Sequence, residues 1–145
     1  MLKLISDITL VKRFDLPIAS NGCSVVASGY QGMWVTKDAT GHAYDLVTPT
    51  LLAYPVWTES NKDGTVGWSG DVSATGNITV LFGKFQAITD KYVAANMALG
   101  AALTVSSGLL KVAAGSEPVV AVCTKVIGSA TYGNLTSTFI EFDKL

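Results

Sequence analysis

The sequence predicts an all-β fold, either a small antiparallel β-barrel or a β-sandwich, with at most one short helix. Short apolar segments recur along the chain, and turn-forming residues separate them at intervals of about 8–12 residues. Sixteen Val and fifteen Thr residues favour pleated, half-buried strand surfaces. A length of 145 residues suits one domain with its own core, so we expect a single β domain over 1–145.

Residues 1–18 are predicted to form either the first strand of the core or an extended N-terminal arm laid on a neighbouring molecule. Strand alternation places Ile8 and Leu10 on one face and Thr9 and Val11 on the other, and Pro17 ends the regular segment. The apolar candidates for an interface in this segment are Leu4, Ile8, Leu10 and Phe14.

The middle of the chain contains the strongest strand signal. The run Asn77–Phe82 is rich in β-branched and aromatic residues, and Phe85–Thr89 follows it after Gly83-Lys84. Glycine in a short connection provides positive φ without steric cost, so these two runs predict a tight central β-hairpin. Earlier strands are expected at 23–27, 33–37, 44–47 and 56–59.

The last third of the chain returns to strands after one segment that could be helical. Alanines in Val93–Leu99 favour helix, but so short a segment supports only a short helix or a turn. The continuous apolar run Val119–Val126 predicts a strand buried on both faces. Further strands are expected at 103–105 and 109–112, around a turn at 106–108, and at 138–142.

Only 14% of the residues are charged, against about 25% in a typical soluble domain, and 49% are hydrophobic. Either much of the exterior is covered by a partner, or the surface is rich in Ser, Thr and Gly. The net charge is −1, and Lys12-Arg13 is the only adjacent basic pair. Nucleic acid is therefore not an expected partner.

No apolar run approaches the ~20 residues that span a bilayer, so no membrane association is expected. The first residues lack the pattern of a signal peptide, which favours a protein made and kept in a reducing cytosol or released by lysis. Cys23 and Cys123 both lie in apolar strand-like contexts. We favour buried free thiols over the alternative of a disulfide.

Side-chain patterns for catalysis or metal binding are weak throughout. The single histidine, His42, has no Ser or Cys near it in the sequence to act as a nucleophile, so we expect an exposed imidazole in a loop. The loop Glu59–Gly64 resembles the start of a calcium loop, but Gly70 stands where a bidentate Glu is required. Gly83-Lys84 lacks the spacing of a phosphate-binding loop. We expect no enzyme, cofactor or metal site.

Trp34, Trp57 and Trp68 lie in the first half of the chain together with several tyrosines. Such residues pack in cores or serve at interfaces, where they provide rigid area and a polar group. Both alternatives stay open for the set, and a sugar-binding platform is one form of the second.

Roughly the last two-thirds of the chain, from Pro55 onward, resembles the capsid decoration (cement) proteins of tailed phages. The signals are typical of a fold, and none of them is a catalytic motif. The similar segments are Val56–Gly64, Gly67–Val72, Thr75–Gly83, Thr89-Asp90, Gly100–Val105, Gly108–Leu110 and Ala121–Cys123.

The resemblance implies an all-β protein of the virion that binds the outside of the shell formed by the major capsid protein and stabilises it. It also implies a homo-oligomer, a dimer or a trimer, often with an extended terminal arm. The residues expected at the interface are the segment Leu2–Phe14 and the tryptophans Trp57 and Trp68. The alternative is a carbohydrate-binding accessory module of a virion, with Trp57 and Trp68 as its platform.

Overall fold

The computed structural model of the chain describes residues 1–7, 10–18, 32–57, 77–133 and 135–145. Strands account for 57% of the structure and helix for 1%, which confirms the predicted all-β class. The predicted strand at 23–27 lies outside the described residues. The strands are β1 (Leu2–Leu4), β2 (Lys12–Pro17), β3 (Trp34–Lys37), β4 (Ala43–Asp45), β5 (Tyr54–Pro55), β6 (Asn77–Phe82), β7 (Phe85–Thr89), β8 (Ala102–Ser106), β9 (Leu109–Val112), β10 (Ala121–Tyr132) and β11 (Leu135–Lys144).

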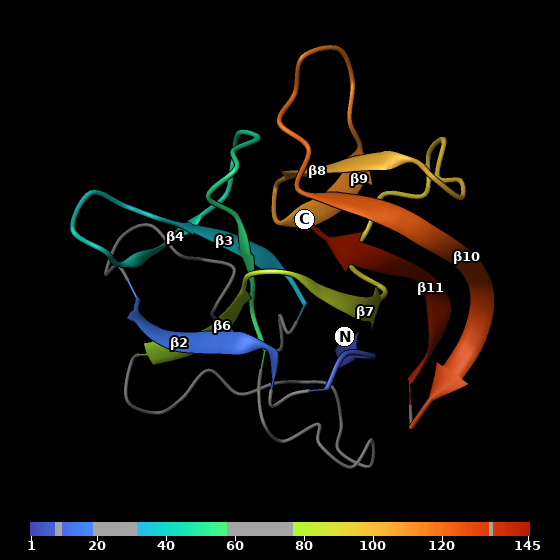
Figure 1. Ribbon diagram of the computed structural model, residues 1–145, viewed down its shortest axis with the longest axis horizontal. Helices are drawn as coiled ribbons and strands as arrows, with labels where there is room; N and C mark the ends of the chain where they lie inside the picture. Colours follow the sequence, from blue (N-terminus) through green and yellow to red (C-terminus); the bar gives the residue numbers. More distant parts are fainter. Residues whose placement is uncertain (8–9, 19–31, 58–76, 134) are drawn as a thin grey trace.

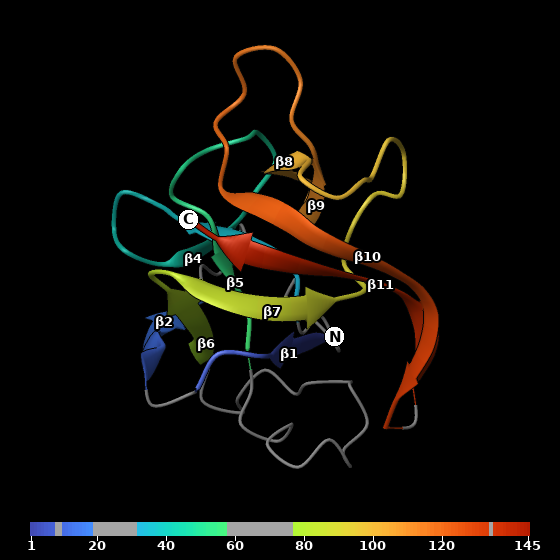
Figure 2. The same cartoon turned by 45° about the vertical axis from the view of Figure 1, so that its right-hand side comes forward.

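Six of these strands form one curled antiparallel sheet in the order β1-β7-β11-β10-β8-β9 (Figures 1 and 2). β10 pairs with β8 only at Ala121 and Val122, and β11 pairs with β7 only over Ile140–Lys144. The far half of the β10–β11 hairpin therefore projects beyond the sheet as a two-stranded ribbon. β10 carries two register shifts in this region, the second beside Gly128, whose φ is 73°. Bulges of this kind bend a strand and increase its twist.

The other five strands close into a small barrel. β2 pairs with β6, and β3 pairs with both β4 and β5. Two isolated bridges join these groups, Val56 with Val80 and Ile18 with Ala43, so the ring of strands is complete. The barrel interior is an apolar cluster with members from all sides of the ring: Leu16, Val35, Ala43, Val56, Ile78 and Val80.

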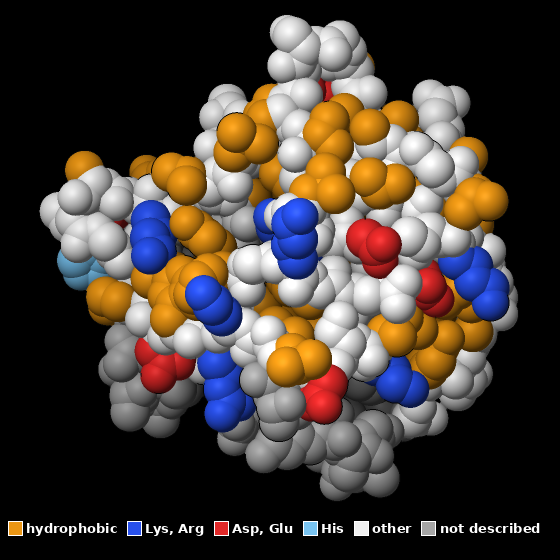
Figure 3. Space-filling view, viewed as in Figure 1, with side chains coloured by type: hydrophobic (Ala, Val, Ile, Leu, Met, Phe, Trp, Pro, Cys, Tyr) orange, Lys and Arg blue, Asp and Glu red, His pale blue; other side chains and the backbone are white. Residues whose placement is uncertain are grey.

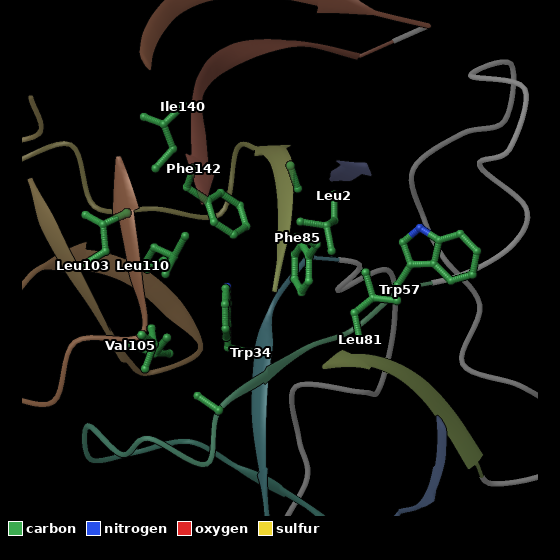
Figure 4. Packing of buried hydrophobic residues seen from close by; sticks show 14 of the residues in the cluster. Leu2, Trp34, Trp57, Leu81, Phe85, Leu103, Val105, Leu110, Ile140 and Phe142 are labelled. Carbon is green, nitrogen blue, oxygen red and sulfur yellow. The ribbon is translucent and has the colours of Figure 1, made fainter. Parts of the chain in front are cut away.

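The main core lies between the barrel and the six-stranded sheet. Trp34, the first residue of β3, is fully buried there, and its ring centroid lies 6.0 Å from that of Phe142. Figure 4 shows Trp34 in the middle of the cluster, between side chains of the β8–β9 hairpin and Phe85. The Trp34 backbone N–H also donates to the Gly108 carbonyl at 2.9 Å. This residue therefore joins the two halves of the fold.

The predicted hairpin between Asn77–Phe82 and Phe85–Thr89 is wrong. β6 pairs with β2 in the barrel, whereas β7 lies between β1 and β11 in the sheet. Both edges of β7 are occupied by strands distant in sequence, so no edge is left for β6. Gly83 does adopt a positive φ, 84°, but the chain uses this freedom to pass from the barrel into the sheet.

The hairpin predicted around residues 106–108 is confirmed. Ser107 and Gly108 both have positive φ, 50° and 75°, and Ser106 pairs with Leu109 across them. These are the features of a two-residue type I′ turn, whose twist matches that of the flanking strands. The segment Val93–Leu99 forms turns and contains no helix.

The prediction that Val119–Val126 is buried on both faces is wrong. Val120, Ala121 and Cys123 are buried, but Val122 is only half-buried and the side chain of Val126 is 46% exposed. The reason is that β10 runs past the end of the core, so its later residues have no layer above them.

The chain begins inside the sheet, with Leu2–Leu4 as β1 beside β7. Met1 and Leu2 are buried, and the Met1 α-ammonium pairs with the Asp90 carboxylate. Thr89 Oγ1 donates to the Met1 carbonyl at 2.8 Å. Burial lowers the pKa of the Met1 α-amino group from 8.0 to about 6, although the hydrogen bond to Asp90 opposes this shift.

This lowered pKa predicts a stability that falls as the pH falls from 8 to 6. The unfolded chain, with an α-amino pKa near 8.0, binds the proton more tightly than the folded chain across this window. At about 1.4 kcal/mol per pKa unit, we expect a loss of about 2–3 kcal/mol, measured by urea denaturation at several pH values.

The measurement is best made in a His42→Asn background, which removes the one histidine of the chain. Asp90→Asn removes the negative charge that raises the α-amino pKa and leaves a neutral hydrogen-bond acceptor in its place. The pH-dependent loss should then extend to lower pH. A free energy of unfolding that is flat between pH 6 and pH 8 would contradict this account.

Candidate functional site

One end of the small barrel carries three half-buried aromatic side chains and two exposed lysines. The residues are Phe14 and Lys12 of β2, Lys37 of β3, Tyr54 of β5 and Phe82 of β6. We call these five residues the barrel-mouth surface. On the side of the molecule seen in Figure 3, hydrophobic side chains gather over the barrel strands, and basic side chains lie around them.

The register of β2 and β6 explains how these residues reach one place. Leu16 lies opposite Ile78, Phe14 opposite Val80, and Lys12 opposite Phe82. Because side chains alternate along a strand, these positions share one face. That face starts with Leu16 and Ile78 in the barrel interior and ends with Lys12 and Phe82 at the mouth.

The Phe14 ring makes edge-to-face contacts with both other rings. The Phe14 ring lies 5.4 Å from that of Tyr54 at an interplanar angle of 82°, and 4.9 Å from that of Phe82 at 71°. This geometry places the positive edge of one ring against the negative face of the next. Phe14 is thus held between two partners.

The two lysines place their ammonium groups over these rings. Lys37 Nζ lies 4.2 Å from the centroid of Phe14 and 5.5 Å from that of Tyr54, and Lys12 Nζ lies 5.8 Å from that of Phe82. Such cation–π contacts contribute about 0.5–1 kcal/mol each at exposed sites. Neither lysine forms an ion pair in the part of the chain that the structure describes. The site therefore presents two positive charges above an aromatic floor.

The residues predicted to lie at an interface differ in how exposed they are in the structure. Phe14 is part of the barrel-mouth surface, and Leu10, two residues before β2, is 79% exposed. Leu4 is half-buried and packs against the main core. Trp57 is a correction: only 4% of it is exposed, because it packs in the main core, so it offers almost no area to a partner. Ile8 and Trp68 lie outside the described residues.

The sequence did not predict four of the five residues of this surface, namely Lys12, Lys37, Tyr54 and Phe82. The alternation Lys12-Phe14-Leu16 is visible in the sequence, and so is Ile78-Val80-Phe82. Only the pairing of β2 with β6 shows that both series end at the same side, and that pairing joins residues sixty or more positions apart.

His42 lies in the turn between β3 and β4, and its side chain is 41% exposed. The Asp38 carboxylate accepts hydrogen bonds from the Thr40 backbone N–H, the Thr40 hydroxyl and the His42 backbone N–H, at 2.8–2.9 Å. The bond from the Thr40 hydroxyl is the main cause that lowers the pKa of Asp38. Thr40 Oγ1 also lies 2.6 Å from His42 Nδ1. These polar groups hold a five-residue turn.

Cys123 is a buried free thiol, as predicted, and burial raises its pKa. Such a thiol is less reactive than an exposed one. Cys23 and the calcium-like loop Glu59–Gly64 lie outside the described residues. Among the residues that are described, no group of three or more His, Cys, Asp or Glu side chains is placed to hold a metal ion.

A search of the described residues finds no helix with the length and apolar character needed to cross a membrane. Comparison of the chain with protein-family models, with curated proteins and with solved structures finds no match.

Proposed function

We propose that this chain is a decoration protein of a tailed-phage head. It would be made in the host cytoplasm, bind the outer surface of the assembled shell as a homo-oligomer, and stabilise that shell without catalysing a reaction. The sequence resemblance described above supports this proposal for the last two-thirds of the chain. The all-β architecture is the one that the resemblance implies.

The proposal depends mainly on one observation: the chain has few charged residues and exposes large apolar side chains. Among the described residues, ten large hydrophobic side chains are at least 40% exposed. Single exposed residues are ordinary, but Val47, Leu51 and Leu52 lie together in the one loop between β4 and β5. Apolar surface of this kind is stabilised when a partner covers it. Many copies on a repeating shell also add weak contacts through avidity.

The projecting β10–β11 ribbon supports self-association. No charged residue occurs from Val126 to Ile140. Exposed hydroxyls face one another across the two strands, Ser129 opposite Thr138 and Thr131 opposite Thr136. Hydroxyl groups both donate and accept, so this surface is complementary to a second copy of itself. Within the described residues, β10 has no strand partner on its outer edge from Thr124 to Thr131.

The alternative proposal, a carbohydrate-binding module of a virion, has less support. Its platform was to include Trp57, which is buried, while Trp68 lies outside the described residues. At the barrel mouth, ammonium groups lie over the Phe14 and Phe82 rings, whose faces would have to stack on a sugar. Binding of the purified protein on a glycan array would favour this alternative.

The proposed function is tested by co-sedimentation of the purified protein with shells assembled from the cognate major capsid protein. We expect the protein to pellet with the shells, to saturate at a fixed ratio, and to raise the temperature at which they come apart. Sedimentation equilibrium of the protein alone should give the mass of a dimer or a trimer. Protein that stays in the supernatant at saturating shell concentration would contradict the proposal.

A further inference from the structure

We infer that the barrel-mouth surface binds an acidic segment of a partner protein. This inference deepens the proposed function, on which the identity of the partner rests, because it names the docking surface and the chemistry of the segment that the shell would present. The charges of Lys12 and Lys37 and the rings beneath them favour such a segment, and the same combination disfavours other classes of ligand.

Two lysines give the surface its positive charge. Lys12 and Lys37 are both exposed, and neither has a carboxylate partner in the described part of the chain. Each ammonium group lies over a ring, and both lysines are exposed to solvent. A carboxylate that approaches from the solvent accepts a charge-assisted hydrogen bond while the cation–π contact is kept. Two such positions select a segment with more than one acidic residue.

The rings make the surface a docking site for a protein rather than for small anions alone. Phe14, Tyr54 and Phe82 are each partly accessible, so they offer apolar contact between the two charges. The edge-to-face contacts of Phe14 with Tyr54 and Phe82 fix the arrangement before binding. A preformed floor reduces the side-chain ordering that binding requires. Aromatic residues are also enriched at protein interfaces.

Other ligand classes fit less well. Single-stranded nucleic acid binds to basic grooves that follow many phosphates and to rings with free faces. Here the surface has two lysines on a chain of net charge −1, and those lysines already lie over ring faces. Sugars need the same free faces. A segment of carboxylates and apolar side chains uses both features as they stand.

The test compares three variants with the wild-type chain. Lys12→Glu/Lys37→Glu reverses both charges, and Lys12→Arg/Lys37→Arg keeps them. Lys84→Glu reverses an exposed lysine in the connection between β6 and β7 as a matched control. Binding is measured by co-sedimentation with cognate shells at low and high salt. It is also measured by fluorescence anisotropy with a labelled peptide of alternating Glu and Phe, and with the same peptide in which Gln replaces Glu.

We expect the double Glu variant to bind the shells and the acidic peptide at least about tenfold more weakly than the wild type. The Arg variant and Lys84→Glu should stay within about threefold of the wild type, because the first keeps both charges and the second is not one of the five residues of the barrel-mouth surface. Wild-type binding should weaken as salt rises, and the Gln peptide should bind more weakly than the Glu peptide. Thermal unfolding of each variant serves as the folding control.

The outcomes separate the inference from the proposed function. If the wild type does not bind the shells but binds the acidic peptide through Lys12 and Lys37, the proposed function fails and the inference stands. If wild type and double Glu variant bind the shells and the peptide equally well, the inference is overturned and shell binding stands. A single-stranded oligonucleotide that binds this surface more tightly than the acidic peptide would also overturn it. Should the double Glu variant unfold, the single variants Lys12→Glu and Lys37→Glu give the same comparison.

Discussion

Replacing Trp34 with alanine is expected to lower the free energy of unfolding by about 3–5 kcal/mol, the largest effect of any single change considered for this chain. Trp34 is fully buried between the barrel and the six-stranded sheet and packs near Phe142. Truncation removes apolar area from the core and leaves a cavity, because strands on both sides limit collapse. Urea denaturation with a common m-value for wild type and variant measures the difference.

Trp34→Phe is the matched control. The Trp34 Nε1 donor is buried and has no acceptor within the described part of the chain. Phenylalanine keeps much of the apolar volume and removes this unpaired donor, so its cost should be well below that of alanine. Equal losses for the two variants would mean that ring volume at this position does not hold the halves of the fold together.

Local features of the fold were predictable because their causes lie within a few residues. The β8–β9 hairpin follows from Ser107-Gly108, which supplies the two positive φ values of its turn. β11 follows from alternating apolar residues. The pairing of β6 was not predictable in this way. Gly83 permits a hairpin as well as a change of sheet, and strands far away in sequence decide between the two.

The candidate site shows the same limit for side chains. Phe14 was named from its apolar character alone, whereas its ring partners Tyr54 and Phe82 come from strands forty and sixty-eight residues later. Trp57 illustrates the opposite error, since its type suits a core and an interface equally well. The layer that covers it decides, and that layer forms only when the barrel and sheet pack together.

Replacing Gly32 with alanine is expected to destabilise the chain by roughly 2–5 kcal/mol, for two separable reasons. The φ of Gly32 is 86°, a left-handed conformation that costs an L-residue about 1–2 kcal/mol. A Cβ at this position would also lie 2.5 Å from the Met1 carbonyl oxygen, which is backbone and held by Thr89 Oγ1. One of the two backbones must therefore move.

Gly41→Ala separates these causes, because Gly41 has nearly the same φ, 85°, but an added Cβ would meet no atom within 4 Å. We expect it to lose only the conformational term, so the difference between the two variants in urea denaturation reports the close approach of Gly32 to Met1. Displacement of Met1 should also expose its α-ammonium, which pairs with Asp90. Gly32→Ala should then lose part of the pH dependence between pH 6 and 8 that Gly41→Ala keeps. Equal free energies of unfolding for the two variants would show that the Met1 backbone moves away from the added Cβ at little cost. The contact with Gly32 would then not fix the position of Met1.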